Sequence, residues 1–476
     1  MKTIEQIETT RDTSAPKSIS PFVPMNPNHR VAIAGLILLL VMAIGIHIIL
    51  NNQPISSLPW VYLALQLNLL LLLVPIIWYK KSYGWLHPLV FSIFLSLIFH
   101  VRRIGMYLVG IEWHPALPSL SDISLTSLVA YELLLNAGGL IFYYLGFFCS
   151  PHFAIPRINF KQPRNLDKKV LIAVMFSVMV FAVYMQTRGG IIAHMLSWGR
   201  GRNAEFAGQY YWQSLIQFGL IACLIWLAMG RNIYTKPIFW ISTAAMLIIQ
   251  FLTTGGRGGI VYALIYMLLV FMVREQKIAP TKILVALMVG FILMGVLGEL
   301  RQSTWEGELG QSKEETSIGA SFQKGLQEIS ERSWRSFGSL PILARVPNDV
   351  DFLYGSSYVA LFSLPIPRGF WPEKPKLVGG RVTRTFFNGS YGIPPGAIGE
   401  NYWNFGIPGV LGAFFIFGSF HKWLADVFCR YAQHPAVGVL YALILYNSAP
   451  TSSAILSCLL LILPALIMLR VMGAIV

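Results

Sequence analysis

The stretch VAIAGLILLLVMAIGIHIIL, residues 31–50, contains no Asp, Glu, Lys or Arg, and its one ionisable side chain is that of His47. An α-helix rises 1.5 Å per residue, so about 20 apolar residues cross the hydrocarbon core of a bilayer. Comparable runs recur along the chain, and they predict about twelve membrane-spanning helices. The expected spans are 31–50, 59–79, 86–108, 124–148, 169–186, 211–229, 234–253, 258–273, 282–299, 402–420, 436–449 and 453–470.

The composition agrees with this pattern. The 476 residues are 55% hydrophobic and only 12% charged, whereas soluble proteins carry about 25% charged residues. The sequence therefore predicts one all-α polytopic membrane domain. The first span lacks a small-residue cleavage site, so we expect it to be retained rather than removed as a signal peptide.

The basic residues predict the orientation of the spans. Lys80, Lys81, the stretch 157–169, Arg231 and Arg274 all fall on the side that holds both chain ends. Since Lys and Arg accumulate in cytoplasmic loops, we expect both termini in the cytoplasm. The predicted organisation is a cytoplasmic tail (1–30), transmembrane helices 1–9 (31–299), a large periplasmic loop (300–401) and transmembrane helices 10–12 (402–476).

A net charge of +15 is typical of a protein that binds nucleic acid or anionic lipid. In this chain the distribution of the basic residues along the sequence is more informative than their sum, and we expect no nucleic-acid partner. The basic residues of the short outer segments are all arginines: Arg102, Arg103, Arg188, Arg200, Arg202 and Arg257. Placing a charged residue at the centre of a membrane helix costs roughly 2.5–3.5 kcal/mol, so several arginines on or near the outer face need a functional or structural reason. The planar guanidinium grips phosphate oxygens in pairs, so these arginines predict a phosphate or pyrophosphate substrate at the outer face. The alternative is that they snorkel to the interface as structural residues.

Two outer loops share an arginine that is followed eleven positions later by glycine. Arg188 precedes Gly199, and Arg381 precedes Gly392. Further arginines accompany them: Arg200 and Arg202 in the first loop, and Arg384 in the second. The matched context favours a shared role in holding an anion.

The motif TTGGRGG, residues 253–259, surrounds Arg257 with four glycines at the start of a helix. Glycine lets backbone amides approach an anion, and the first N–H groups of a helix are unpaired. An arginine there opposes the helix dipole, which favours a bound phosphate. A tight turn with a solvated arginine is the alternative.

The motif PPGAIGENYWNFGIPG, residues 394–409, places Glu400 at the membrane edge among aromatic residues. Such a setting suits a general base. The alternative is an acid that stabilises a helix N-terminus. Asp349 and Asp351 match the DxD pattern of metal-dependent glycosyltransferases, but so short a match is also typical of a turn, and we expect no metal ion.

These features resemble the O-antigen polymerase (Wzy-type) family of oligosaccharide repeat-unit polymerases. The resemblance lies in the plan of spans with one large late outer loop and in the paired Arg–Gly elements. It also lies in TTGGRGG (253–259), PIPRGFWPEKP (365–375) and PPGAIGENYWNFG (394–406).

The resemblance implies a GT-C-like fold in the bacterial inner membrane. It implies an enzyme that polymerises undecaprenyl-pyrophosphate-linked oligosaccharides at the periplasmic face, releasing undecaprenyl pyrophosphate without metal or cofactor. The implied partners are these lipid-linked substrates, membrane lipids, a chain-length regulator and a flippase. The sugars, and whether the polymer is O-antigen lipopolysaccharide, capsule or exopolysaccharide, stay open.

The residues divide into two groups on this interpretation. The catalytic candidates are Glu400, Arg257 and Arg381. The candidates for binding pyrophosphate or sugar are Arg188, Arg200, Arg202, Arg384, Arg368, Arg102, Arg103 and Tyr402.

A chain-length partner or structural scaffold is one alternative, although it would not need outer arginines, and two other functions are further alternatives. O-antigen ligases share the large loop, but theirs typically carries a functional histidine, and no histidine lies between Arg301 and Glu400. A transporter or flippase predicts internal repeats with matched broken helices, and no repeat is visible in the sequence.

Overall fold

The computed structural model describes most of the chain. The described residues are 22–50, 58–80, 83–97, 122–155, 157–197, 210–254, 257–277, 288, 338–363, 366, 370–371, 373–387 and 392–475. Within them, the side chains of 47–50, 58–59, 122–126, 197, 210, 254 and 257 lie outside the description. Residues 1–21 of the predicted tail and the span 282–299, except Met288, also lie outside it.

The described residues form an all-helical fold without strands, apart from two isolated bridges. The larger helices are α1 (Pro27–Leu50), α2 (Leu58–Leu71), α5 (Asp122–Cys149), α6 (Leu166–Thr187), α9 (Tyr210–Met229), α10 (Pro237–Thr254), α11 (Arg257–Glu275), α17 (Gly396–Tyr431), α18 (Pro435–Asn447) and α19 (Ser452–Met472). The smaller ones are α3 (Val74–Ile77), α7 (Ile191–Ser197), η2 (Ile233–Thr235), α14 (Ser339–Arg345), α15 (Ser356–Phe362) and α16 (Val378–Phe387).

Eight helical segments in the described residues are long and apolar enough to cross a membrane. Three shorter apolar helices, Pro88–Leu97, Pro237–Thr253 and Pro435–Asn447, overlap other expected spans. The prediction of an all-α membrane protein is therefore confirmed at this level.

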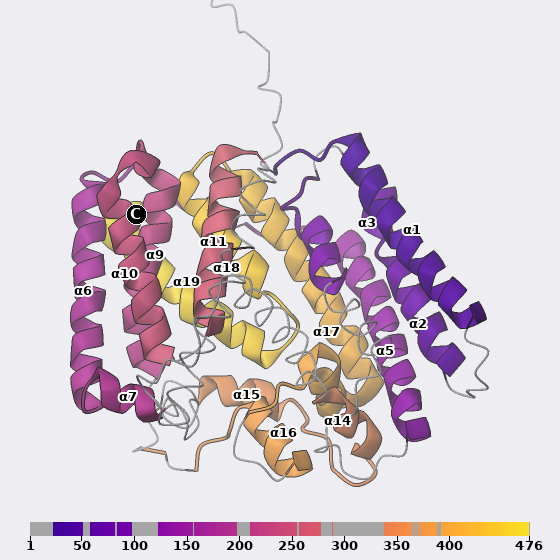
Figure 1. The fold of residues 1–476 in the computed structure, drawn as a ribbon. Helices are drawn as coiled ribbons and strands as arrows, with labels where there is room; N and C mark the ends of the chain where they lie inside the picture. The colour runs from indigo at the N-terminus through magenta and orange to yellow at the C-terminus, as the bar shows by residue number, and fades with distance from the viewer. Residues whose placement is uncertain are drawn as a thin grey trace, which may run out of the picture.

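The helices form a bundle with two distinct ends (Figure 1). At one end, which we call the capped end, α14, α15 and α16 lie across the bundle, with α7 beside them. The opposite end, which we call the C-terminal end, carries bridges between Phe160 and Ile475 and between Pro24 and Gly84. The first described residues and the last ones thus share one end, as the predicted topology requires.

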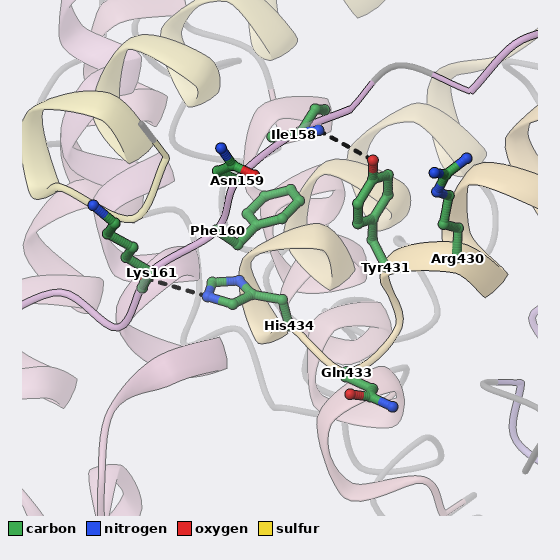
Figure 2. A pocket seen from close by; sticks show the side chains of 8 residues that line it. All are labelled: Ile158, Asn159, Phe160, Lys161, Arg430, Tyr431, Gln433 and His434. Carbon is green, nitrogen blue, oxygen red and sulfur yellow. Dashed lines mark hydrogen bonds between the residues drawn. The ribbon is translucent and has the colours of Figure 1, made fainter. Parts of the chain in front are cut away.

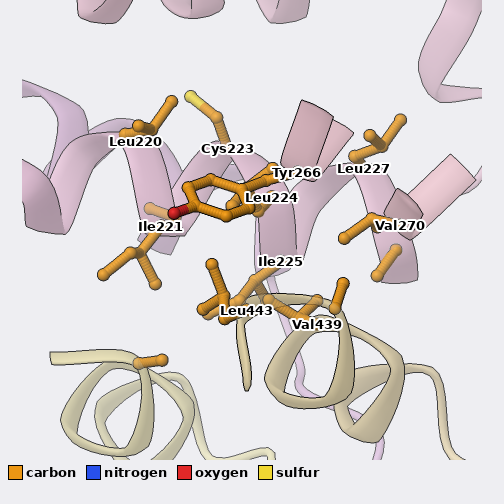
Figure 3. Packing of buried hydrophobic residues seen from close by; sticks show 14 of the residues in the cluster. Leu220, Ile221, Cys223, Leu224, Ile225, Leu227, Tyr266, Val270, Val439 and Leu443 are labelled. Carbon is orange, nitrogen blue, oxygen red and sulfur yellow. The ribbon is translucent and has the colours of Figure 1, made fainter. Parts of the chain in front are cut away.

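Helix α9 occupies the centre of the larger core. Leu220, Ile221, Leu224 and Ile225 on α9 are buried, and Trp226 has no exposed surface. Figure 3 shows Ile221, Leu224 and Ile225 beside Tyr266 of α11 and Val439 and Leu443 of α18. A helix that is apolar all round is expected where other helices surround it.

Glycines allow α5 and α17 to pack very closely. A Cβ atom on Gly418 would lie 1.9 Å from the Tyr143 carbonyl oxygen, and one on Gly146 would lie 2.0 Å from that of Phe415. Small residues bring membrane helices together in this way. The α5–α17 pair supports the second apolar core and carries α14 at its capped end.

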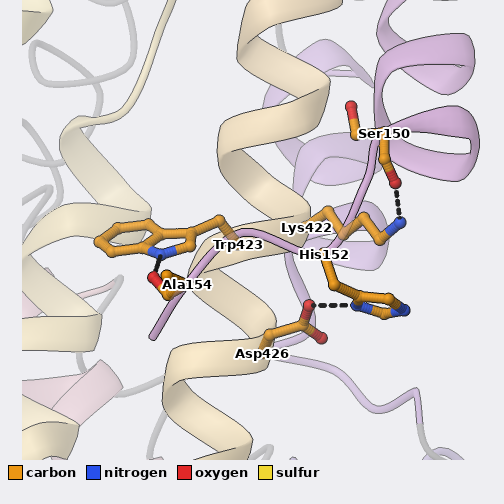
Figure 4. Close-up of polar contacts among 6 residues, drawn as sticks. All are labelled: Ser150, His152, Ala154, Lys422, Trp423 and Asp426. Carbon is orange, nitrogen blue, oxygen red and sulfur yellow. Dashed lines mark hydrogen bonds and ion pairs between the residues drawn. The ribbon is translucent and has the colours of Figure 1, made fainter. Parts of the chain in front are cut away.

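The segment that follows α5 is joined by polar contacts to the C-terminal half of helix α17. Lys422 Nζ donates to the Ser150 carbonyl, and Trp423 Nε1 donates to the Ala154 carbonyl at 3.4 Å (Figure 4). His152 Nδ1 lies 3.4 Å from Asp426 Oδ2. These contacts position the segment that connects α5 to α6.

Helix α17 begins at Gly396, before the predicted start at 402, and is broken near its beginning. Phe405 has φ −145° and ψ 20°, and Gly406 has φ 64° and ψ −149°. Positive φ favours glycine, and Pro408 cannot donate a backbone hydrogen bond inside the helix. The break creates a short arm, Gly396–Asn404, that projects its polar residues into the capped end.

Candidate functional site

The site is built partly on the amphipathic helix α16. Val378, Val382 and Phe386 are buried on one face, where the Phe386 ring lies 5.2 Å from that of Trp403 in the α17 arm. With 3.6 residues per turn, Arg384 lies on the side of α16 opposite this apolar face, and Arg381, one turn earlier, lies at the edge of the face. Arg381 is half-buried and Arg384 is exposed.

Two hydrogen bonds hold the Arg381 guanidinium in place. Its Nη1 donates to Ser356 Oγ at 2.7 Å, and its Nε donates to the Lys376 carbonyl at 3.0 Å. Burial lowers the pKa of Arg381, yet a guanidinium stays charged at neutral pH. The result is an oriented cation with donor capacity left over.

Glu400 is 1% exposed, and both of its carboxylate oxygens accept hydrogen bonds. Oε1 accepts from Ser357 Oγ at 2.8 Å, and Oε2 accepts from the backbone N–H of Ser452 at 3.1 Å. Ser452 is the first residue of α19. The alternative drawn from the sequence was that Glu400 stabilises a helix N-terminus. Its carboxylate does contact one, but that N-terminus belongs to α19 and not to α17, the helix that contains Glu400.

Helix α15 connects two of the three predicted catalytic residues, Arg381 and Glu400. Ser356, which binds Arg381, and Ser357, which binds Glu400, are consecutive residues of its first turn. The oriented cation and the buried carboxylate are thus attached to neighbouring side chains. This juxtaposition is the central feature of the site.

Two asparagines of the arm complete the network, and the sequence analysis missed both. Asn404 Nδ2 donates to Ser357 Oγ at 2.9 Å, and its Oδ1 accepts from the Gly355 N–H at 2.9 Å. Asn401 Oδ1 accepts from the Tyr358 hydroxyl at 2.7 Å. Asn404 lies in the predicted span 402–420 and Asn401 directly before it, and this position was the available signal, since polar groups in such segments need partners.

The Tyr358 hydroxyl remains a donor in this network. Its pKa is raised chiefly by burial and further by the charge of Glu400, while the hydrogen bond with Asn401 opposes the rise. A protonated phenol beside a buried carboxylate adds no second negative charge to the site.

A second buried carboxylate anchors the capped end. Glu132 of α5 is 3% exposed and accepts from Ser339 Oγ of α14 at 2.5 Å. The half-buried Tyr402, predicted to bind substrate, has its ring 6.1 Å from that of Tyr131 in an edge-on contact. Tyr402 therefore belongs to the junction of the arm with α5.

The remaining predicted residues are placed only in part. Arg188 follows α6 at the capped end, and its guanidinium carbon lies 5.2 Å from the centre of the Tyr184 ring. Arg257 begins α11, but its side chain lies outside the described residues. Also outside them are Arg102, Arg103, Arg200, Arg202 and Arg368.

The acidic pair of the DxD pattern makes local contacts. Asp349 pairs with Arg345 at 3.3 Å, and the Asp351 carbonyl accepts from Trp403 Nε1 at 3.2 Å. In the described part of the chain, no three His, Cys, Asp or Glu residues form a group that could hold a metal ion.

No protein-family model, curated protein or solved structure matches this chain. What the site can do therefore follows from its own residues. Arg381, with Arg384 one turn later on α16, can hold an anionic oxygen. Glu400 can accept a proton if its contact with Ser357 opens.

Proposed function

We propose that the chain is a metal-independent membrane glycosyltransferase that polymerises undecaprenyl-pyrophosphate-linked oligosaccharides and releases undecaprenyl pyrophosphate. In this proposal it has a twelve-span, GT-C-like architecture in the bacterial inner membrane, with both termini in the cytoplasm. The capped end then faces the periplasm. A flippase would supply its lipid-linked substrates, and a chain-length regulator would act with it.

The observation that carries the proposal is the attachment of Arg381 and Glu400 to the neighbouring serines of α15. In the transfer, the bond between the anomeric carbon and the pyrophosphate oxygen breaks, and the acceptor hydroxyl oxygen forms the new bond. The leaving pyrophosphate gains negative charge, which an oriented guanidinium stabilises. Arg384, one turn later on α16, would extend this contact to a second anionic oxygen.

The acceptor hydroxyl must also lose its proton. Glu400 can take it as general base only when the Ser357 hydroxyl swings away, because the carboxylate is buried. The competing role is a positioning one, in which Glu400 holds α15 and thereby orients Arg381. Substitution by glutamine, treated in the Discussion, separates the two roles.

The test uses purified protein in proteoliposomes supplied with a synthetic undecaprenyl-pyrophosphate-linked repeat unit. Wild-type protein should yield lipid-linked oligomers, and Arg381→Gln should lose this activity. Arg345→Gln is the matched control, because Arg345 is a cation of the same capped end that pairs with Asp349. Retained oligomer synthesis by Arg381→Gln would refute the site assignment.

The same assay separates the alternative functions. Movement of the lipid-linked unit across the bilayer without elongation would indicate a flippase. Transfer of the glycan to a lipid A core acceptor, with no transfer between two repeat units, would indicate a ligase.

A further inference from the structure

The imidazole of His421 lies buried inside the helix bundle, and both of its ring nitrogens make hydrogen bonds. Nδ1 lies 2.8 Å from the Tyr143 hydroxyl of α5, and Nε2 lies 2.9 Å from Ser448 Oγ at the end of α18. The residue is only 3% exposed. One side chain of α17 thus contacts two other helices, and neither bond reaches Arg381 or Glu400 directly.

The hydrogen-bond pattern identifies the ring nitrogen that carries the proton. The Ser448 hydroxyl donates to the Leu445 carbonyl at 3.0 Å, so its oxygen can only accept from His421. Nε2 therefore carries the hydrogen, and Nδ1 accepts from the Tyr143 hydroxyl. The neutral imidazole is oriented from both sides, and its Nε2–H is directed at the residue that follows α18.

Ser448 begins the short connection between α18 and α19, residues 448–451. At Ser448 the backbone leaves the helical conformation, with φ −72° and ψ 124°. The connection ends at Thr451, the N-cap of α19, whose Oγ1 accepts from the Ala454 N–H at 3.1 Å. The placement of these few residues determines where the first N–H groups of α19 point.

The same connection contacts the arm of α17 near its other end. Asn401 Nδ2 donates to the Pro450 carbonyl at 2.7 Å, and the Ser452 N–H donates to Glu400 Oε2 at 3.1 Å. Glu400 and Asn401 precede the break in α17, whereas His421 follows it. The connection and the first residue of α19 thus join the two parts of α17 across the break.

We infer that His421 is a positioning residue for Glu400: by holding Ser448, it fixes the connection that presents the Ser452 N–H to the carboxylate. Side chains of a reactive site are held precisely when further hydrogen bonds hold their own partners. The effect of His421 on elongation rests on the proposed function, whereas its effect on the Ser452 N–H does not. The competing role is packing alone, in which the bond with Tyr143 joins α5 to α17.

Four substitutions separate the two bonds of His421. Asparagine places its amide near the position of Nδ1, so His421→Asn keeps an acceptor for Tyr143 and loses the bond with Ser448. Glutamine reaches the position of Nε2, so His421→Gln keeps a donor for Ser448 and loses the bond with Tyr143. Ser448→Ala removes the acceptor with the smallest change of shape. Tyr143→Phe is the matched control, because it removes one hydroxyl from the opposite nitrogen.

The first measurement is amide hydrogen exchange of the full chain in detergent, which requires no activity. The reporter peptide is 448–455, which contains the Ser452 N–H, and the amides of α9 in the larger core report global unfolding. Loss of one hydrogen bond changes a local opening equilibrium about two- to tenfold. Relative to α9, the reporter peptide should exchange faster by this factor in His421→Asn and Ser448→Ala. It should exchange as in wild type in His421→Gln and Tyr143→Phe.

The second measurement is the rate of elongation in the proteoliposome assay. The kcat should fall about two- to tenfold in His421→Asn and Ser448→Ala and stay near wild type in the other two variants. The KM for the lipid-linked unit should change little, because Glu400 is expected to act on the acceptor hydroxyl after the substrate has bound.

Unchanged exchange of the reporter peptide in both His421→Asn and Ser448→Ala overturns the inference. Equal acceleration in all four variants overturns it as well, because His421 would then act through its packing against α5. A kcat that does not follow the bond with Ser448, although the exchange does, overturns the role in elongation. The expected exchange pattern in a wild-type protein that makes no oligomer would refute the proposed polymerase and support the positioning of Ser452 by His421.

Discussion

Substitution of Glu400 tests whether this buried carboxylate acts in chemistry or in positioning. Glu400→Ala leaves the Ser357 hydroxyl and the Ser452 N–H without their acceptor inside the protein. Each buried donor left unsatisfied costs about 1–3 kcal/mol, so the variant should lose about 2–6 kcal/mol of unfolding free energy. The lost side-chain packing adds to this cost.

Glu400→Gln preserves the shape of the side chain and most of the network. Its amide oxygen can accept from the Ser452 N–H, and its NH₂ group can donate to Ser357 Oγ once that hydroxyl rotates. We therefore expect a smaller stability loss than for Glu400→Ala, about 1–3 kcal/mol, because the Ser452 N–H keeps an acceptor and only the Ser357 hydroxyl must find a new one. A neutral amide cannot take a proton from an acceptor hydroxyl, so as general base Glu400 predicts loss of polymerisation in a folded variant.

Two measurements decide between these outcomes. Unfolding in mixed micelles containing increasing dodecyl sulfate reports stability, and the proteoliposome assay reports elongation. A Glu400→Gln protein as unstable as Glu400→Ala would refute the hydrogen-bond reasoning. A stable Glu400→Gln protein that elongates like wild type would refute the role as base and leave the positioning role.

Two further predictions concern packing and pH. Gly418→Ala should cost about 1–3 kcal/mol of unfolding free energy, because the added Cβ would lie 1.9 Å from the Tyr143 carbonyl oxygen. Gly412→Ala is the matched control on the same helix, with no atom within 4 Å of the added Cβ, and an equal loss in both would contradict the close α5–α17 contact. The pKa of His434 is lowered from 6.5 chiefly by burial, against the hydrogen bond with the Lys161 carbonyl. As the pH falls, the unfolded chain therefore binds a proton at His434 before the folded protein does. The contribution of His434 to the free energy of unfolding is complete above pH 6.5, and it is lost as the pH falls toward the lower pKa of the folded state. The thermal stability of His434→Asn should depend less on pH over this window than that of wild type, and parallel curves would refute the assignment.

Much of the helical framework follows from the sequence, because a bilayer selects for long apolar runs whatever they pack against. The positions and directions of breaks within helices are harder to predict from the sequence. The expected span at 402–420 becomes the longer α17, whose arm reaches back to Gly396. Gly406 and Pro408 mark the break in the sequence, but they do not say in which direction the arm projects.

The candidate site was predicted as a set of residue types rather than as an arrangement. The chemistry of Arg381 and Glu400 predicts a role for each, and the structure adds that α15 connects them. Asn401 and Asn404 were missed because they look like ordinary polar residues until Tyr358 and Gly355 are placed beside them. A pocket lined by residues 158–161 and by Arg430, Tyr431, Gln433 and His434 (Figure 2) was missed, because these two segments lie far apart in the sequence.

The sequence by itself determined that this chain is a bundle of membrane helices with two different ends, because hydropathy and charge act locally along the chain. Only the tertiary structure decided which polar groups meet. The hydrogen-bond partners of Glu400, Ser357 and Ser452, lie 43 and 52 residues away from it in the sequence. Such contacts depend on the break in α17 and on the close packing of α5 against it, and neither can be read from local composition.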